Sequence, residues 1–127
     1  MNATAVQEET YTIAEVAAKT GVSAHTLRYY ERIGLLDVGR HANGHRRFTE
    51  YDVHGVVFIG RLRATAMPIR EIQHYFALVA AGPSTEGDRI ALLRSHRRHV
   101  RARLRELEEA LGAIEHKIAR YGGSRAP

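Results

Sequence analysis

Apolar residues recur at helical spacing in separate stretches of the chain, and each stretch is bounded by residues that begin or end helices. In the first stretch, Thr12 and Glu15 have the spacing of a capping box, in which the side chain of each residue accepts a hydrogen bond from the backbone N–H of the other. Ile13 and Val16 then supply one apolar face, and Gly21 is placed to end the helix. The pattern predicts a short amphipathic helix.

A second helix is predicted directly after this glycine, over residues 24–33. Ser23 can cap its start, and Gly34 can end it. Leu27 and Tyr30 lie three residues apart and form its inward face. Two short helices joined by a tight turn that contains Gly form a helix-turn-helix arrangement.

A β-hairpin is predicted next, because Asn43 and Gly44 both tolerate positive φ and stand between basic segments. These segments would form a two-stranded wing. Thr49 and Asp52 then have the spacing of another capping box, which opens a helix that runs to about Ala66. The wing is therefore expected between two helices.

The remaining pattern predicts two more helices, one starting at Pro68 and ending at Gly82, and a long one over residues 86–121. The long helix carries a heptad seam with one charged interruption, Arg97. A narrow apolar stripe on so long a helix needs a partner, and the simplest partner is the same helix of a second chain. The expected dimerisation residues are Ile90, Leu93, Val100, Leu104, Leu107, Leu111, Ile114 and Ile118.

The expected fold is mainly α, a winged helix-turn-helix head followed by a long dimerisation helix. The head spans residues 11–82 and the dimerisation helix spans residues 85–121. Polar segments without periodicity flank them, and we expect a disordered arm over residues 1–10 and a disordered tail over residues 122–127.

The charge balance favours a nucleic-acid partner. Nineteen Lys and Arg against fourteen Asp and Glu give a formal net charge of +5. Nearly all the bases are arginine, whose planar fork suits phosphate and guanine, although a GC-rich genome would produce the same bias. The absence of cysteine excludes disulfides, thiolate zinc sites and thiol redox sensing. No signal-like or membrane-spanning apolar run occurs, so we expect a cytoplasmic protein without membrane contact.

The helix-turn-helix residues resemble the MerR family of bacterial transcription regulators. The matching runs are Ile13-Ala14-Glu15-Val16-Ala17, Gly21-Val22-Ser23, Thr26-Leu27-Arg28-Tyr29-Tyr30-Glu31, Gly34-Leu35-Leu36 and, at the wing, Asn43-Gly44-His45-Arg46. The resemblance covers residues 12–121. It implies an antiparallel coiled-coil dimer that binds a pseudo-palindromic promoter element, bends and untwists the DNA, and has RNA polymerase as a partner.

Within this family, the start and end of the long helix look most like the aldehyde-responsive branch. That branch carries a cysteine in the third helix, where this chain has Arg61. The metal-sensing members also use cysteines, and none is present here. No cofactor or metal is expected, since His96 and His99 form a pair without a third ligand.

The second helix and the wing are expected to hold DNA. His25, Arg28 and Tyr29 share the outward face of the helix, although Tyr29 could instead be a core aromatic. By the family pattern, Arg46 is the residue of the wing that we most expect to contact the DNA phosphate backbone. The full set of expected DNA contacts is Ser23, His25, Thr26, Arg28, Tyr29, Arg40, His45, Arg46, Arg47, Arg61 and Arg63.

The basic first half of the long helix has two interpretations. It could line a pocket for an anionic effector beside Tyr75, Phe76 and Val79. Alternatively, it could meet the acidic half of a partner helix in an antiparallel pair, and we favour this second interpretation. The effector, if one exists, is not indicated by the sequence.

The function expected is a dimeric, sequence-specific regulator. The alternative is an architectural or excisionase-like DNA-bending protein without ligand control, which the long heptad helix disfavours. No nucleophile–base set, phosphate loop or metal cluster indicates an enzyme. The residues do not distinguish activation from repression.

Overall fold

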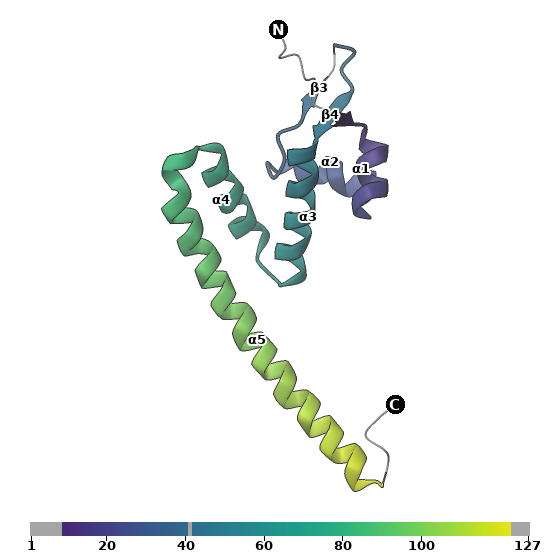
Figure 1. The fold of residues 1–127 in the computed structure, drawn as a ribbon, viewed down its shortest axis with the longest axis vertical. Coiled ribbons are helices and arrows are strands. Elements are labelled where there is room, and N and C mark those ends of the chain that lie inside the picture. The colour runs from purple at the N-terminus through teal and green to yellow at the C-terminus, as the bar shows by residue number, and fades with distance from the viewer. Residues whose placement is uncertain (1–8, 41, 123–127) are drawn as a thin grey trace. The chain divides into compact units, whose positions relative to one another are not determined.

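The computed structural model describes residues 9–40 and 42–122 and divides into two compact units, Met1–Glu86 and Gly87–Pro127. The elements of the first unit are shown in Figure 1: β2 (Thr10–Tyr11), α1 (Ile13–Thr20), α2 (Ala24–Arg32), β3 (Gly39–Arg40), β4 (Arg46–Thr49), α3 (Glu50–Ala64), α4 (Ile69–Ala80) and the 3-10 helix η1 (Pro83–Thr85). Most of the second unit is the helix α5 (Glu86–Arg120). The predicted mainly α fold, with a helix-turn-helix, a wing and a long last helix, is confirmed.

The predicted helix starts are formed as hydrogen-bonded caps. Thr12 Oγ1 accepts a hydrogen bond from Glu15 N at 3.1 Å, and Glu15 Oε1 accepts one from Thr12 N at 2.8 Å. Thr49 and Asp52 form the same reciprocal pair at the start of α3. These bonds satisfy N–H groups that have no partner within the helix, which fixes where α1 and α3 begin.

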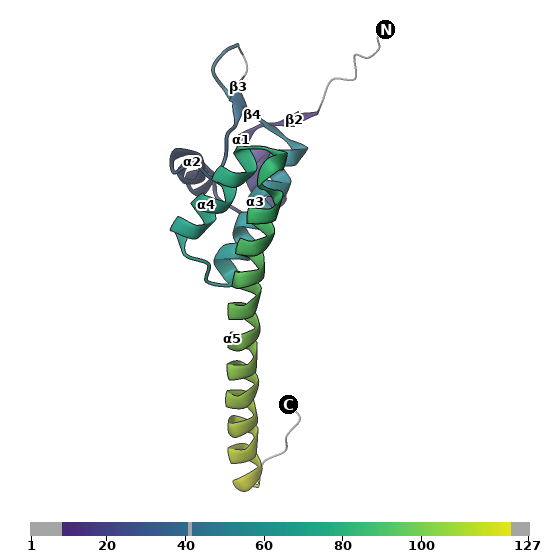
Figure 2. The same cartoon turned by 90° about the vertical axis from the view of Figure 1, so that its left-hand side faces the viewer.

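The wing contains one strand more than the sequence pattern predicts. The sheet order is β2-β4-β3, so β4 is the central strand, and β2 lies beside it (Figure 2). Thr10 pairs with Thr49, and Tyr11 pairs with Phe48. Thr10 therefore belongs to the sheet and not to the arm predicted over residues 1–10, of which residues 1–8 lie outside the described part.

Tyr11 connects β2 to α3 through a hydrogen bond and to α1 through a cation–π contact. Its hydroxyl donates a hydrogen bond to Glu50 Oε1 at 2.9 Å, and the Nζ of Lys19 lies 4.7 Å from its ring centroid. The bond to the Glu50 carboxylate raises the pKa of Tyr11 to about 12, because ionisation would remove the donated proton and place two negative charges together. The phenol therefore keeps its proton, and its hydrogen bond, at a pH at which an ordinary tyrosine ionises.

The core of the first unit draws one or more side chains from each of its longer elements. Fully buried side chains come from α1, α2, β4, α3 and α4, namely Val16, Leu27, Phe48, Val56, Ile59 and Ile72. Tyr30 is only 3% exposed, which confirms its predicted place in the core. Because Leu27 and Tyr30 hold the inward face of α2, the rotation of this helix about its axis is fixed and its opposite face points outward.

Two helices of the head end in the same backbone motif with different residues. At the end of α2, Gly34 has φ +87° and the N–H of Leu35 bonds the carbonyl of Tyr30. At the end of α3, Ala66 has φ +67° and the N–H of Met67 bonds the carbonyl of Leu62. Both are Schellman motifs, whose left-handed residue is usually Gly because a Cβ is unfavourable there.

Replacing Ala66 with Gly is therefore expected to stabilise the protein. The substitution removes the backbone strain of an alanine held in the left-handed region. This gain exceeds the cost of the larger conformational entropy that glycine gives the unfolded chain, so the free energy of unfolding should rise by about 0.5–1 kcal/mol. The matched change Gly34→Ala should lower it by a similar amount, since no atom lies within 4 Å of the added Cβ and only backbone strain acts. Urea unfolding followed by circular dichroism measures both changes. If the free energy of unfolding rose in both variants or fell in both, this explanation would be contradicted.

The helix α5 has 35 residues and none of them is buried in the single chain. Its apolar side chains are unusually exposed for their type, among them Leu104 (54%), Leu107 (51%), Leu111 (55%) and Ile114 (57%). Such a row of exposed large apolar side chains indicates an interaction surface. Of the tail predicted over residues 122–127, only Gly122 is described, and it lies in a turn. Within the described ranges, no helix is long and apolar enough to cross a membrane.

Candidate nucleic-acid interface

The start of α2 is fixed by two hydroxyl side chains that were predicted as DNA contacts. Ser23 Oγ accepts a hydrogen bond from the backbone N–H of Thr26 at 3.1 Å and donates one to Thr26 Oγ1 at 3.0 Å. In the free protein these two residues therefore cap the helix. The cap holds the first turn of α2, on which His25 stands, in a single conformation.

The outward face of α2 presents His25 and Arg28, and both side chains are exposed. They lie three residues apart on the side of the helix opposite the buried Leu27 and Tyr30. A helix whose inner face is fixed in a core and whose outer face carries Arg and His has the form of a recognition helix, which reads base edges and phosphates from one side.

Tyr29 lies between the two faces of α2. Its side chain is half-buried, and its ring centroid is 6.3 Å from that of Tyr30 at an interplanar angle of 48°. The guanidinium of Arg32 lies 5.6 Å from the same centroid, within range of a cation–π contact. The ring is therefore supported by neighbours on α2, and its assignment as a DNA contact stays a prediction.

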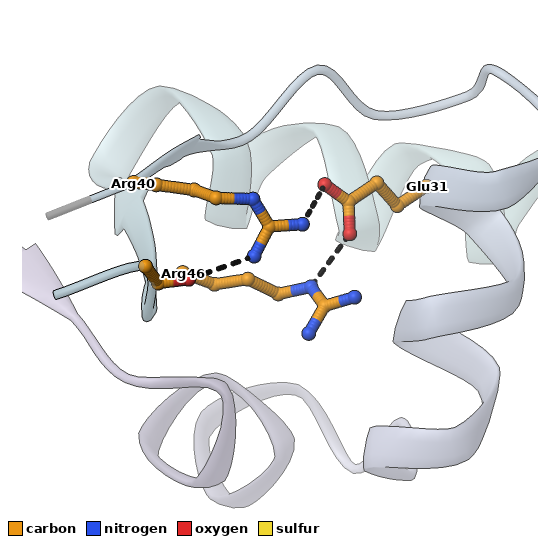
Figure 3. Close-up of polar contacts among 4 residues, drawn as sticks. Glu31, Arg40 and Arg46 are labelled. Carbon is orange, nitrogen blue, oxygen red and sulfur yellow. Dashed lines mark hydrogen bonds and ion pairs between the residues drawn. The ribbon is translucent and has the colours of Figure 1, made fainter.

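The wing is joined to α2 by a cluster of one acid and two bases, Glu31, Arg40 and Arg46, which we call the wing cluster (Figure 3). Glu31 Oε1 accepts a hydrogen bond from Arg46 Nε at 2.5 Å, and Glu31 Oε2 accepts one from Arg40 Nη2 at 3.2 Å. A second nitrogen of Arg40 donates to the carbonyl of Gly44 at 3.2 Å. The carboxylate on α2 thus holds both strands of the hairpin, β3 through Arg40 and β4 through Arg46.

This cluster fixes the spacing between the recognition helix and the wing. The sequence predicts DNA contacts for Arg40 and Arg46 but does not single out Glu31, their partner in the free protein. The Glu31 side chain is 20% exposed and that of Arg46 is 26% exposed, so their ion pair is screened less than a pair fully open to solvent. At the tip, the N–H of His45 bonds Asn43 Oδ1 at 3.0 Å, which orders the turn.

The other predicted contacts lie on two elements. Arg47 is exposed on β4, and Arg61 and Arg63 are exposed in the last turns of α3. An Nη1 of Arg63 lies 3.5 Å from the Tyr30 hydroxyl, at the long limit of a hydrogen bond. The DNA role of these three arginines stays a prediction.

A contact that sequence reasoning missed fastens the end of the recognition helix. Gln73 Nε2 on α4 donates a hydrogen bond to the carbonyl of Ile33 at 2.8 Å. This carbonyl follows the last turn of α2 and has lost its helical partner, so the amide satisfies it. The start of α2 is thus held by Ser23 and its end by Gln73.

The predicted effector residues belong to an aromatic cluster within the first unit. Tyr75 packs edge-on against Phe76 with ring centroids 5.0 Å apart, and its centroid is 5.6 Å from that of Phe58 on α3. Val79 is half-buried on the same helix. The cluster packs α4 against α3, and its binding of an effector stays a prediction. In the described part of the chain, no three His, Asp or Glu side chains gather as metal ligands.

Replacing Glu31 with Gln is expected to loosen the wing and to reduce DNA specificity. A neutral amide cannot hold two guanidinium groups, so we expect a loss of about 1 kcal/mol in the free energy of unfolding. The lost negative charge should also strengthen non-specific DNA binding, which lowers the ratio of specific to non-specific affinity. Gel shifts with competitor DNA measure this ratio. Glu71→Gln, the same change at an exposed position of α4, is the control, and an equal fall in both variants would contradict a role for the wing cluster.

Known proteins share both units of this chain. Residues 11–78 match the family described as MerR HTH family regulatory protein, and residues 53–117 match the family described as MerR, DNA binding. An uncharacterised HTH-type transcriptional regulator of Haemophilus influenzae is 36% identical over 118 residues, which cover 92% of this chain and 87% of that protein.

Solved structures give the same result. HiNmlR, described as a MerR family regulator lacking the sensor domain and bound to promoter DNA, is 36% identical, with a TM-score of 0.83 and 90% and 91% of the two chains covered. A MerR family regulator of Bacillus thuringiensis is 31% identical, with a TM-score of 0.79 and 89% and 100% covered. Family models and relatives both extend over the recognition helix, the wing and α5. The chain belongs to the MerR family of helix-turn-helix transcription regulators.

Proposed function

We propose that this regulator binds a promoter as a homodimer, placing α2 in the major groove of each half-site and the wing beside it. One observation carries the proposal: the exposed pair His25 and Arg28 stands on a helix that the wing cluster joins to a basic hairpin. Helix and hairpin then act as one rigid reading surface. The relative HiNmlR is described as bound to promoter DNA, and the similarity spans nearly all of both chains.

The homodimer follows from the exposed seam of α5 and from the two-fold symmetry that most operators share with their regulators. A dimer whose two heads are held at a fixed distance favours DNA that is bent or untwisted to meet both heads, so we propose that binding distorts the promoter. RNA polymerase is then the partner that reads this distortion. Since promoter DNA lies in the bacterial cytoplasm, we place the protein there.

Recognition of DNA is proposed to need only the two units of this chain, as in the relative whose description says that it lacks the sensor domain. Effector control, if present, is proposed to act through the aromatic cluster of Tyr75 and Phe76. A thermal-shift screen of small molecules tests this. A ligand that raises the melting temperature should lose its effect in Phe76→Ala, and a screen without such a ligand would overturn effector control through this cluster.

Binding-site selection from random duplexes, followed by footprinting on the selected sequence, tests the proposed function. We expect one preferred pseudo-palindrome with two-fold symmetric protection. We also expect a steep fall of affinity with salt, because each neutralised phosphate releases counterions. Protection without a preferred sequence would instead support the architectural alternative, and no discrete complex on any duplex would contradict DNA recognition altogether.

A further inference from the structure

The flank of α5 beside the apolar seam carries four charged residues, each seven residues from the next. With Ile90 at heptad position a, position e is occupied by Arg94, Arg101, Glu108 and Glu115, which we call the e flank. Its first half is entirely basic and its second half entirely acidic. Position e borders the seam directly, so its side chains lie where they meet a partner helix.

An antiparallel partner helix brings these halves together. In such a pair each a residue faces a d residue, so Leu104 faces the partner's Leu107 and Val100 faces the partner's Leu111. The same alignment sets Arg101 opposite the partner's Glu108 and Arg94 opposite the partner's Glu115. Two-fold symmetry repeats both contacts, so every residue of the e flank has an opposite charge across the interface.

The neighbouring registers keep only part of this complementarity. A slip of one heptad in one direction places Arg101 against the partner's Arg101 on the two-fold axis and leaves only Arg94 opposite an acid, the partner's Glu108. A slip in the other direction places Glu108 against the partner's Glu108 and leaves only Arg101 opposite the partner's Glu115. A parallel pair sets position g against position e, which brings Arg103 beside the partner's Glu108 but also Arg89 beside the partner's Arg94, so its attractive contacts are offset by repulsive ones. Like charges directly opposite are unfavourable, so each alternative is penalised.

We propose that the e flank sets the register of the homodimer, with the two-fold axis passing between Arg105 and Glu106. The inference rests on the proposed antiparallel dimer and adds the alignment of its two helices. The seam is nearly uniform in Leu, Ile and Val, so it tolerates slipping by whole heptads, whereas charges of fixed order do not.

Register matters for DNA binding because each head is covalently joined to its own α5. A slip of one heptad moves one helix along the other by about 10 Å. Adjacent half-sites on one face of DNA are about 34 Å apart, so a shift of this size prevents both heads from meeting their grooves together. The e flank therefore determines which half-site spacing the dimer accepts.

Charge reversal in the full chain provides the first test. Arg101→Glu and Glu108→Arg each create two like-charge contacts in their own homodimer, and we expect each to weaken dimerisation about tenfold. An equimolar mixture should recover the wild-type dissociation constant, because the heterodimer of the two variants has opposite charges at both contacts. Native mass spectrometry distinguishes the species. Arg98→Glu, the same reversal at heptad position b on the outer side of the helix, is the control and should leave the dimer unchanged.

Cysteine cross-linking provides the second test, made simple because the chain has no native cysteine. A mixture of Leu104→Cys and Leu107→Cys chains should oxidise to a heterodimer, since these positions face each other in the proposed register. Leu104→Cys mixed with Val100→Cys or Ile114→Cys reports the two slipped registers and should not cross-link. A disulfide between two Leu104→Cys chains would indicate a parallel pair, and we expect none to form.

The outcomes separate this inference from the proposed function. Cross-linking in a slipped or parallel arrangement, or no recovery in the mixture of reversed chains, would overturn the register while leaving the dimer intact. A wild-type chain that sediments as a monomer at micromolar concentration would overturn the homodimer itself. Cross-linking between Leu104→Cys and Leu107→Cys together with recovery in the charge mixture establishes both.

Discussion

Replacing Leu107 with Glu is expected to dissociate the dimer and to lower operator affinity at least about a hundredfold, because two linked heads lose their shared effective concentration. Leu107 is 51% exposed in the single chain and lies next to the proposed two-fold axis. The substitution removes a large apolar side chain from both copies and places two carboxylates in the seam, where they lose hydration without gaining a partner. Sedimentation and gel shifts on one operator measure the two effects.

A matched control separates loss of the seam from a change in charge. Ala113→Glu introduces the same side chain at heptad position c, on the exposed outer side of α5. It should leave both the dimer and the operator complex intact. Circular dichroism should show similar helix content in the two variants, and a stable Leu107→Glu dimer would mean that α5 is not the interface.

The helices were predictable because their limits are set by neighbouring residues. Thr12 with Glu15 and Thr49 with Asp52 form the expected caps, and α1, α3 and α4 begin where these signals and Pro68 place them. Capping, glycine ends and apolar spacing all act within about one turn of helix. One sequence therefore contains all the information that these limits need.

The sheet and the wing cluster depend on residues that are far apart along the chain. The strand β2 has only two residues, too few to show an alternating pattern, and it exists because Tyr11 pairs with Phe48. Glu31 stands nine residues from Arg40 and fifteen from Arg46, and nothing in their local sequence pairs them. Only the fold brings the end of α2 to the hairpin. The two arginines that the sequence predicts as DNA contacts therefore have an acidic partner in the free protein.

Fewer basic side chains are free to contact DNA than the sequence suggests. Two wing arginines share Glu31, whereas Arg28 on α2 is exposed with no ion pair among residues 9–40 and 42–122. An arginine without a competing acid can give its whole hydrogen-bonding fork to one base pair. We accordingly expect Arg28 to make the largest contribution to sequence discrimination.

Replacing Arg28 with Ala is expected to weaken specific binding by about 1–3 kcal/mol for each half-site and to relax the preference at one base pair. The head should keep its stability, because Arg28 is exposed and the core contacts of α2 come from Leu27 and Tyr30. Gel shifts on the operator and on operators changed at single base pairs measure the affinity and the preference. Arg70→Ala, which removes an exposed arginine at the start of α4, should weaken all sequences slightly and equally.

Arg28→Lys decides how the residue acts. A bidentate contact to the O6 and N7 of guanine needs the planar guanidinium, so lysine should not restore the lost discrimination. A phosphate contact needs only the positive charge, so lysine would restore most of the affinity and the salt dependence. We expect the first result. Full rescue by lysine would mean that Arg28 positions the helix and that base reading falls to His25 or Tyr29.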